Sequence, residues 1–191
     1  MRLVPRAYVV AVAAILAAAA GCRKGAPTPE QAFQRLERAV AAGDAAGFYE
    51  CLDNATKSSI DSAYQDQRLQ RTIIQAKFPE AEAGPALAKL DAAAADDAKQ
   101  FFARVAKERK IVEGYRRRLG SVSGPINHKL DGQGAEWLAR SDGMPFRFVK
   151  SSGGSWGFAE LAVEWSLERD RSSHAVKTVR DNAALYQKAG P

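Results

Sequence analysis

The chain has 191 residues, with 28 Lys and Arg against 22 Asp and Glu, two His and two Cys. A chain of this length can bury roughly 70% of its unfolded surface and so form one real hydrophobic core. Its net charge of +6 is mild beside the concentrated basic faces of nucleic-acid-binding domains. Composition therefore favours one globular domain and gives no support for nucleic acid as a partner.

The first 21 residues have the three-part layout of a secretory signal peptide. Arg2 and Arg6 form a basic start, residues 8–20 are an unbroken apolar run, and small residues precede Cys22. The run of about 13 residues is shorter than the roughly 20 that a spanning helix needs. We therefore predict a signal peptide at residues 1–21. Its loss removes two basic residues and no acid, which leaves a net charge of about +4.

The segment "AAGC", which ends at Cys22, resembles the lipobox of bacterial lipoproteins. The resemblance implies cleavage before Cys22 and attachment of acyl chains such as palmitate to it. Two or more chains on one residue are enough for stable anchoring. Arg23, in place of the Asp that marks inner-membrane retention, favours the outer membrane and a periplasm-facing domain. An ordinary signal peptide followed by an unmodified Cys is the alternative.

If Cys22 is lipidated, Cys51 has no intramolecular partner for a disulfide. An envelope protein with one remaining thiol buries it or pairs it between molecules. Cys51 lies between Phe48 and Leu52, so we expect a buried apolar position.

Two helices are expected after a short polar linker at residues 22–27. Thr28 can cap the first, with Gln31 in capping-box register, and Gly43 ends it. Asp44 can cap the second, which carries Phe48.

The central third of the chain also reads as helical. One helix is predicted over residues 57–78, followed by an Ala-rich helix that is interrupted near Gly84–Pro85. A longer helix is predicted from Asp96 or Asp97 to residue 119. We interpret its basic stretch at residues 104–120 as a helix face exposed to solvent. Contact with anionic lipid head groups is the alternative.

After Gly120 the pattern changes to short aromatic-rich segments with turn signals every eight to ten residues. The segments "INHKL", "AEWLARS", "PFRFVKS" and "SWGFAEL" predict an antiparallel meander. Residues 151–154, "SSGG", read as a hairpin turn. The tail at residues 163–189 returns to helical spacing, with a break expected at residues 171–174.

Helices followed by hairpins indicate an α+β fold. Residues 28–52 and 145–161, "PFRFVKSSGGSWGFAEL", resemble the opening helices and late hairpin of the nuclear-transport-factor-2-like superfamily. The resemblance implies a curved antiparallel sheet wrapped over helices around an apolar cavity. A single domain over residues 28–191 would then carry a helical insertion at about 55–119 and an extra C-terminal helix.

Our first functional hypothesis is a non-catalytic envelope protein, held by the lipid on Cys22, that binds an apolar ligand or a protein partner. Aromatic residues of the predicted sheet and helices are the candidate cavity lining: Trp137, Phe148, Trp156 and Tyr64. His128, His174 and Cys51 are widely separated, so no metal site is predicted, and no cofactor is expected.

A cavity enzyme is the second hypothesis, because the superfamily resemblance implies acid–base pairs facing the cavity. His128 or Tyr64 would act with a carboxylate. Other candidates have a structural interpretation beside the catalytic one: helix caps for Asp44 and Asp53, a core edge for Tyr49, and a solvent-facing strand position for Glu136. A third hypothesis is a helical assembly subunit; the sequence leaves the oligomeric state open.

Overall fold

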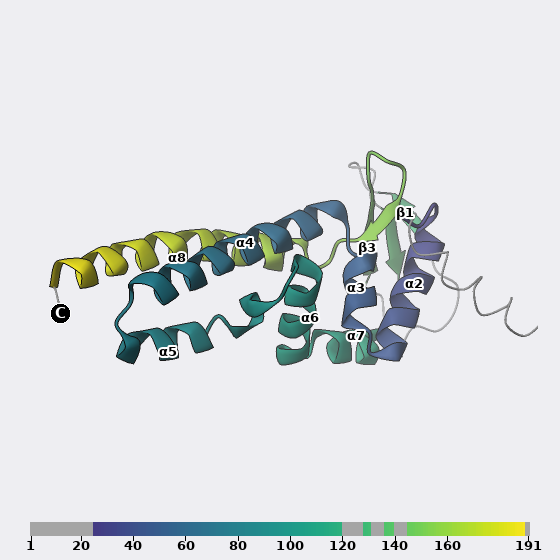
Figure 1. Ribbon diagram of the computed structural model, residues 1–191. Coiled ribbons are helices and arrows are strands. Elements are labelled where there is room, and N and C mark those ends of the chain that lie inside the picture. The colour runs from purple at the N-terminus through teal and green to yellow at the C-terminus, as the bar shows by residue number, and fades with distance from the viewer. Residues whose placement is uncertain (1–24, 120–127, 131–135, 140–144, 190–191) are drawn as a thin grey trace, which may run out of the picture.

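A computed structural model describes residues 25–119, 128–130, 136–139 and 145–189 (Figure 1). Side chains are described except at strand residues 128–130, 136–139 and 145, and at residue 189. The predicted signal peptide and the first half of the predicted linker, residues 22–24 with Cys22, lie outside the described residues. Within them, no helix is long and apolar enough to cross a membrane.

The fold is α+β and mainly helical. Its helices are α2 (Pro29–Ala42), α3 (Ala45–Cys51), α4 (Asn54–Lys77), α5 (Glu80–Ala88), α6 (Ala98–Glu108), α7 (Ile111–Leu119) and α8 (Ala162–Ala189), with a 3-10 turn η3 (Asp91–Ala94). The strands are β1 (His128–Leu130), β2 (Glu136–Ala139), β3 (Pro145–Lys150) and β4 (Trp156–Phe158).

The predicted caps define the first helices. The Thr28 hydroxyl accepts a hydrogen bond from the Gln31 backbone N–H, and Gly43 ends α2 in the left-handed conformation. The Asp44 carboxylate accepts from the Gly47 N–H at the start of α3. Each cap satisfies a backbone group that the helix end leaves free.

The predicted meander is confirmed where the strands are described. The strands pair antiparallel in the order β1-β2-β3-β4. The hairpin turn at 151–154 is also confirmed, because the Ser151 N–H donates to the Ser155 carbonyl at 2.8 Å. Gly154 takes a positive φ of 82° in that turn.

An aromatic core joins the sheet to the helices. Phe33 of α2 contacts Phe148 of β3 at 6.4 Å between ring centroids. Phe48 of α3 lies 5.9 Å from Phe158 of β4 and stacks at 6.0 Å on Phe102 of α6. Trp165, near the start of α8, then lies 5.7 Å from Phe102. Rings at this spacing contribute attraction beyond the area that they bury.

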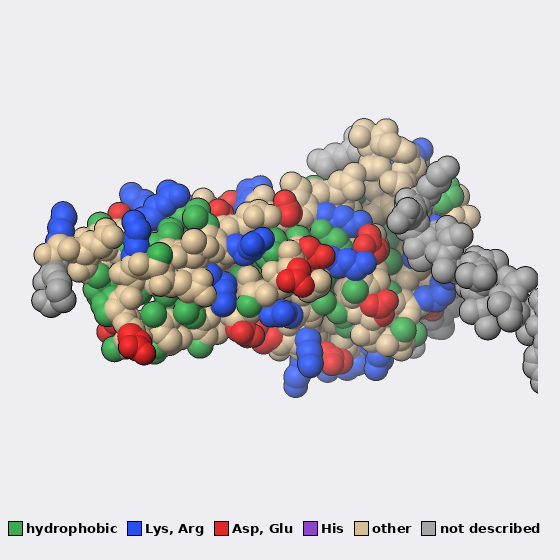
Figure 2. All heavy atoms as spheres, in the orientation of Figure 1, with side chains coloured by type: hydrophobic (Ala, Val, Ile, Leu, Met, Phe, Trp, Pro, Cys, Tyr) green, Lys and Arg blue, Asp and Glu red, His purple; other side chains and the backbone are tan. Residues whose placement is uncertain are grey.

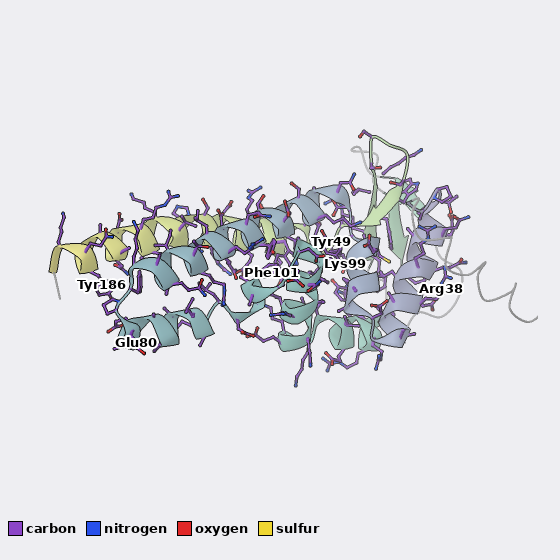
Figure 3. All side chains as sticks on the ribbon, viewed as in Figure 1. Arg38, Tyr49, Glu80, Lys99, Phe101 and Tyr186 are labelled. Carbon is purple, nitrogen blue, oxygen red and sulfur yellow. The ribbon has the colours of Figure 1, made fainter. Side chains whose placement is uncertain are left out.

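Helices α4 and α8 form a long arm that projects from this core (Figure 1). They run parallel, since Gln67 reaches Ser172 in the middle of the arm and Phe78 meets Tyr186 near the tip, at 4.9 Å between ring centroids. Buried polar groups connect the two helices in the middle of the arm, where the Gln70 amide donates to the Ser172 carbonyl at 3.1 Å. Figure 3 places Tyr186 and Glu80 at the far end of the arm and Arg38 at the opposite end of the molecule.

Three predicted helix boundaries are wrong. Helix α5 continues through Gly84 and Pro85. The predicted long helix is two, α6 and α7, separated at Lys110, whose φ is +53°. Helix α8 has no break at 171–174, because Ser172 is buried against α4.

The basic stretch at 104–120 is partly engaged within the fold. Arg109 pairs with Glu168 at 3.0 Å, and Arg118 pairs with Glu160 at 2.8 Å. The Arg116 guanidinium donates to the carbonyls of Val40 and Ala41 at the end of α2. Elsewhere, basic and acidic side chains are interspersed over the face shown in Figure 2.

Candidate functional site

A cleft of about 330 Å³ lies beside β4, where three distant segments of the chain meet. Its walls come from the N-terminal segment and α2, from the end of α3 and first turn of α4, and from the β3–β4 hairpin. The lining residues are Gly25, Ala26, Ala32, Arg35, Glu50, Cys51, Leu52, Asp53, Asn54, Ala55, Lys57, Val149, Lys150, Ser151, Ser152, Ser155, Trp156 and Gly157.

The N-terminal segment forms one wall of the cleft because it pairs with β4. The Trp156 N–H donates to the Ala26 carbonyl at 2.8 Å, and Ala26 is only 2% exposed. A side chain at residue 25 would collide with Ser155, since a Cβ placed on Gly25 would lie 2.2 Å from the Ser155 Cβ. Glycine therefore lets the segment approach the hairpin closely.

The floor of the cleft joins β4 to the start of α4. The Asp53 N–H donates to the Phe158 carbonyl at 3.0 Å, and Leu52 bridges Phe158 in parallel register. Gly157 makes this approach possible, because a Cβ there would lie 2.5 Å from the Asp53 Cα.

Both oxygens of the buried Asp53 carboxylate accept hydrogen bonds from the first turn of α4. One accepts from the N–H groups of Ala55 and Thr56 at 2.9 and 3.3 Å, and the other accepts from the Thr56 hydroxyl. The structural interpretation of Asp53 as a helix cap is thus correct. Both of its oxygens are therefore engaged in hydrogen bonds within the fold.

Three basic residues line the cleft: Arg35, Lys57 and Lys150. The Lys57 ammonium donates to the Glu50 carbonyl at 2.8 Å and lies 5.7 Å from the centre of the Tyr49 ring. Burial lowers the pKa of Lys57 because it disfavours the charged form.

The Glu50 carboxylate, which also lines the cleft, pairs with Lys99 of α6 at 2.8 Å. Figure 3 shows Lys99 beside Tyr49, where α3 faces α6. No carboxylate of the described residues lies within ion-pair distance of Lys57. The lining of the cleft thus holds three basic residues and two carboxylates, one of which pairs with Lys99 outside the cleft.

Cys51 sits on the cleft wall, half-buried and with a free thiol. Burial is the main cause that raises its pKa from 9.0 to about 11, outweighing the opposing effect of Lys57. A thiol with a raised pKa is a poor nucleophile at neutral pH. Its surroundings agree with the expected buried position more than with a reactive one.

The predicted cavity residues separate into two groups. Trp156 lines the cleft. Phe148 and Tyr64 are 0% and 1% exposed, belong to the packed core and are not among the residues that line the cleft. Trp137 pairs with Arg147 in the sheet register, and its side chain lies outside the described part. The structure therefore does not bring these four residues together around one cavity.

The predicted acid–base residues are also dispersed. The Tyr64 hydroxyl donates to the Ala95 carbonyl at 2.9 Å and accepts from Arg68 at 3.3 Å. Asp44 caps α3, as its structural interpretation predicts. The side chains of His128 and Glu136 lie outside the described part. Tyr49 is half-buried, and burial is the main cause that raises the pKa of its hydroxyl.

Metal-ligating side chains do not gather in threes anywhere among the described residues. A second hollow of about 390 Å³ lies between α4 and the segment at 93–96. There the Arg71 guanidinium donates to the carbonyls of Leu87 and Leu90, so it holds the loop after α5 in place. This hollow offers less defined chemistry than the cleft beside β4.

Sequence reasoning missed most of the cleft, because Arg35, Lys57 and Lys150 have no common motif. The only local signals were the small residues that allow close approach, Gly25 and Gly157, and the Gly-rich hairpin. Comparison with protein-family models, with curated proteins and with solved structures finds no match to this chain.

Proposed function

We propose that this protein is a lipid-anchored, non-catalytic component of a bacterial envelope, attached through Cys22 and facing the periplasm, with the outer membrane favoured. In this proposal the domain binds its ligand in the cleft beside β4. The position of the cleft is the observation that carries the proposal: the segment leading from Cys22 forms one of its walls.

The chemistry of the cleft favours binding over catalysis. Its thiol has a raised pKa, its buried carboxylate caps a helix, and its amine donates to a backbone carbonyl. None of these described groups forms the nucleophile–base or acid–base pair that catalysis needs. The half-buried indole of Trp156 supplies an apolar surface next to the basic residues.

The nuclear-transport-factor-2-like arrangement belongs to the same proposal. Helices α2 and α3 pack through Phe33 and Phe48 on the β3–β4 hairpin, as that resemblance implies. The interior between them is filled by aromatic rings, which is why we place the ligand in the cleft.

The test is the mass of the N-terminal peptide of protein extracted from membranes of its native host. We expect a peptide that begins at Cys22 and carries added acyl mass. Cys22→Ser should leave the protein unacylated and release it from the membrane fraction, whereas the matched variant Cys51→Ser should stay bound. An unmodified Cys22 in the wild-type peptide would contradict the anchor.

An assembly subunit is the second candidate, favoured by the exposed apolar side chains of α8. Val163, Leu167 and Leu185 are 72%, 51% and 63% exposed. Sedimentation of the extracted protein over a range of concentrations distinguishes the two: a concentration-dependent oligomer that Leu167→Ser weakens supports assembly, and a monomer at all concentrations argues against self-assembly.

A further inference from the structure

The N-terminal segment limits how far the domain can move from Cys22. Ala26 is fixed on β4 by its hydrogen bond with Trp156. Ala26 is four residues along the chain from Cys22, with three residues between them, and an extended chain spans at most about 3.6 Å per residue. The cleft wall at Ala26 thus lies within about 14 Å of any membrane that holds Cys22.

The basic residues of the cleft lie on the same side as this tether. Arg35, Lys57 and Lys150 line the space next to Ala26 together with two carboxylates, Glu50, which pairs with Lys99, and Asp53, which caps α4. The Lys57 ammonium lies beside the ring of Tyr49, and its hydrogen-bond acceptor among the described residues is the neutral Glu50 carbonyl. An anionic oxygen within reach would be a stronger acceptor for it.

The elongated shape of the molecule determines how the domain is oriented when the end that holds the cleft contacts a membrane. Helix α8 has 28 residues, about 42 Å at the usual rise. Its far end lies opposite the end that carries α2 and β3 (Figure 1), two elements that contribute residues to the cleft. Docking of the cleft end on a membrane would therefore direct the arm away from the bilayer.

We propose that the basic cleft docks on the phosphate groups of anionic phospholipids in the membrane that holds the anchor. The inference rests on the proposed anchor, which supplies the proximity, and it names the partner of the same cleft. Arg35, Lys57 and Lys150 contact the phosphates, and Trp156 lies at the level of the head groups, where an amphipathic indole is favoured.

The test uses full-length protein from its host, reconstituted in vesicles of phosphatidylcholine alone or mixed with phosphatidylglycerol. Hydrogen exchange is followed in peptides that cover residues 149–157 and 170–185. We expect slower exchange of the hairpin only on the anionic vesicles, with the α8 peptide unchanged. Because each basic residue near an anionic surface changes binding about fivefold, Lys57→Gln and Lys150→Gln should each reduce the docking equilibrium by about that factor.

Arg180→Gln on the exposed face of α8 is the matched control and should leave hairpin exchange unchanged. High salt should remove the protection, since it screens exposed charges. Equal exchange on the two lipids would overturn the proposal. Equal protection by inorganic phosphate on phosphatidylcholine vesicles would also overturn it, because the cleft would then be a site for free phosphate.

The mass of the N-terminal peptide, measured on the same sample, separates this inference from the proposed function. Acylated Cys22 with no lipid-dependent exchange leaves the anchor intact and refutes docking. Unmodified Cys22 with slower exchange on added anionic vesicles refutes the anchor and supports docking.

Discussion

Replacement of Gly157 by Ala tests the close contact on which the cleft floor depends. A Cβ at this position would lie 2.5 Å from the Asp53 Cα, 2.8 Å from the Asp53 nitrogen and 2.9 Å from the Leu52 oxygen. All three are backbone atoms, so no flexible side chain can move aside. Ordinary contact begins at 3.4 Å, which requires a displacement of about 0.9 Å between β4 and the start of α4.

That displacement would lengthen the bond from the Asp53 N–H to the Phe158 carbonyl from 3.0 Å to about 3.9 Å, beyond hydrogen-bonding range. A buried donor without an acceptor costs about 1–3 kcal/mol, and overpacking adds about 1–3 kcal/mol. We expect Gly157→Ala to lower the free energy of unfolding by about 3 kcal/mol, partial relaxation included, which for a chain of this length corresponds to about 6–12 °C in Tm.

Urea unfolding followed by circular dichroism and tryptophan fluorescence measures this change. Gly114→Ala in α7 is the matched control, because a Cβ there meets nothing within 4 Å. Alanine favours the helix over glycine, so the control should be stabilised by about 0.5–1 kcal/mol. Equal free energies of unfolding for Gly157→Ala and the wild type would refute the reasoning.

Two further predictions concern individual side chains. Because burial raises the pKa of Cys51 to about 11, its alkylation rate in the folded protein should rise about tenfold per pH unit from pH 8 to 10; peptide-resolved mass spectrometry measures this, and a plateau near pH 9 would contradict it. Arg116→Ala should lower the free energy of unfolding by about 1–2 kcal/mol, since the guanidinium caps two carbonyls of α2. The neighbouring exposed Arg117→Ala is its control in the same urea titration, and equal losses in both variants would count against the capping role.

Local signals in the sequence predict the start of the fold well. Thr28, Gly43 and Asp44 act through hydrogen bonds to residues within four positions, so their roles can be read without knowing the tertiary structure. The hairpin at 151–154 is likewise a local feature, closed by bonds between Ser151 and Ser155.

The predicted helix boundaries are wrong where tertiary packing determines where a helix ends. Val105 and Val112 are both buried and seven residues apart, so apolar spacing continues across the break at Lys110 and conceals it. The polar residues near Ser172 suggest a break in α8, but they face the polar Gln67 and Gln70 of α4. Reading polar residues as solvent-exposed is wrong at such an interface.

The cleft could not be predicted for a related reason. It joins residues 25–26, 50–57 and 149–157, which are far apart in sequence and share no motif. Trp156 was predicted as a lining residue from its aromatic type alone. The same argument also selected Phe148 and Tyr64, which the structure places in the packed core. Residue type indicates burial, whereas the position of an open space depends on how the segments meet.

The floor of the cleft and the base of the arm share the same residues. Helix α4 begins at the Asp53 cap, and α8 begins four residues after Phe158, while the Asp53 N–H bonds to the Phe158 carbonyl. A ligand that displaced β4 would have to break this bond or move the start of α4 with it. Because Gly157 leaves no free space between β4 and Asp53, small independent shifts are excluded. The orientation of the arm is therefore determined by the same contacts that shape the cleft.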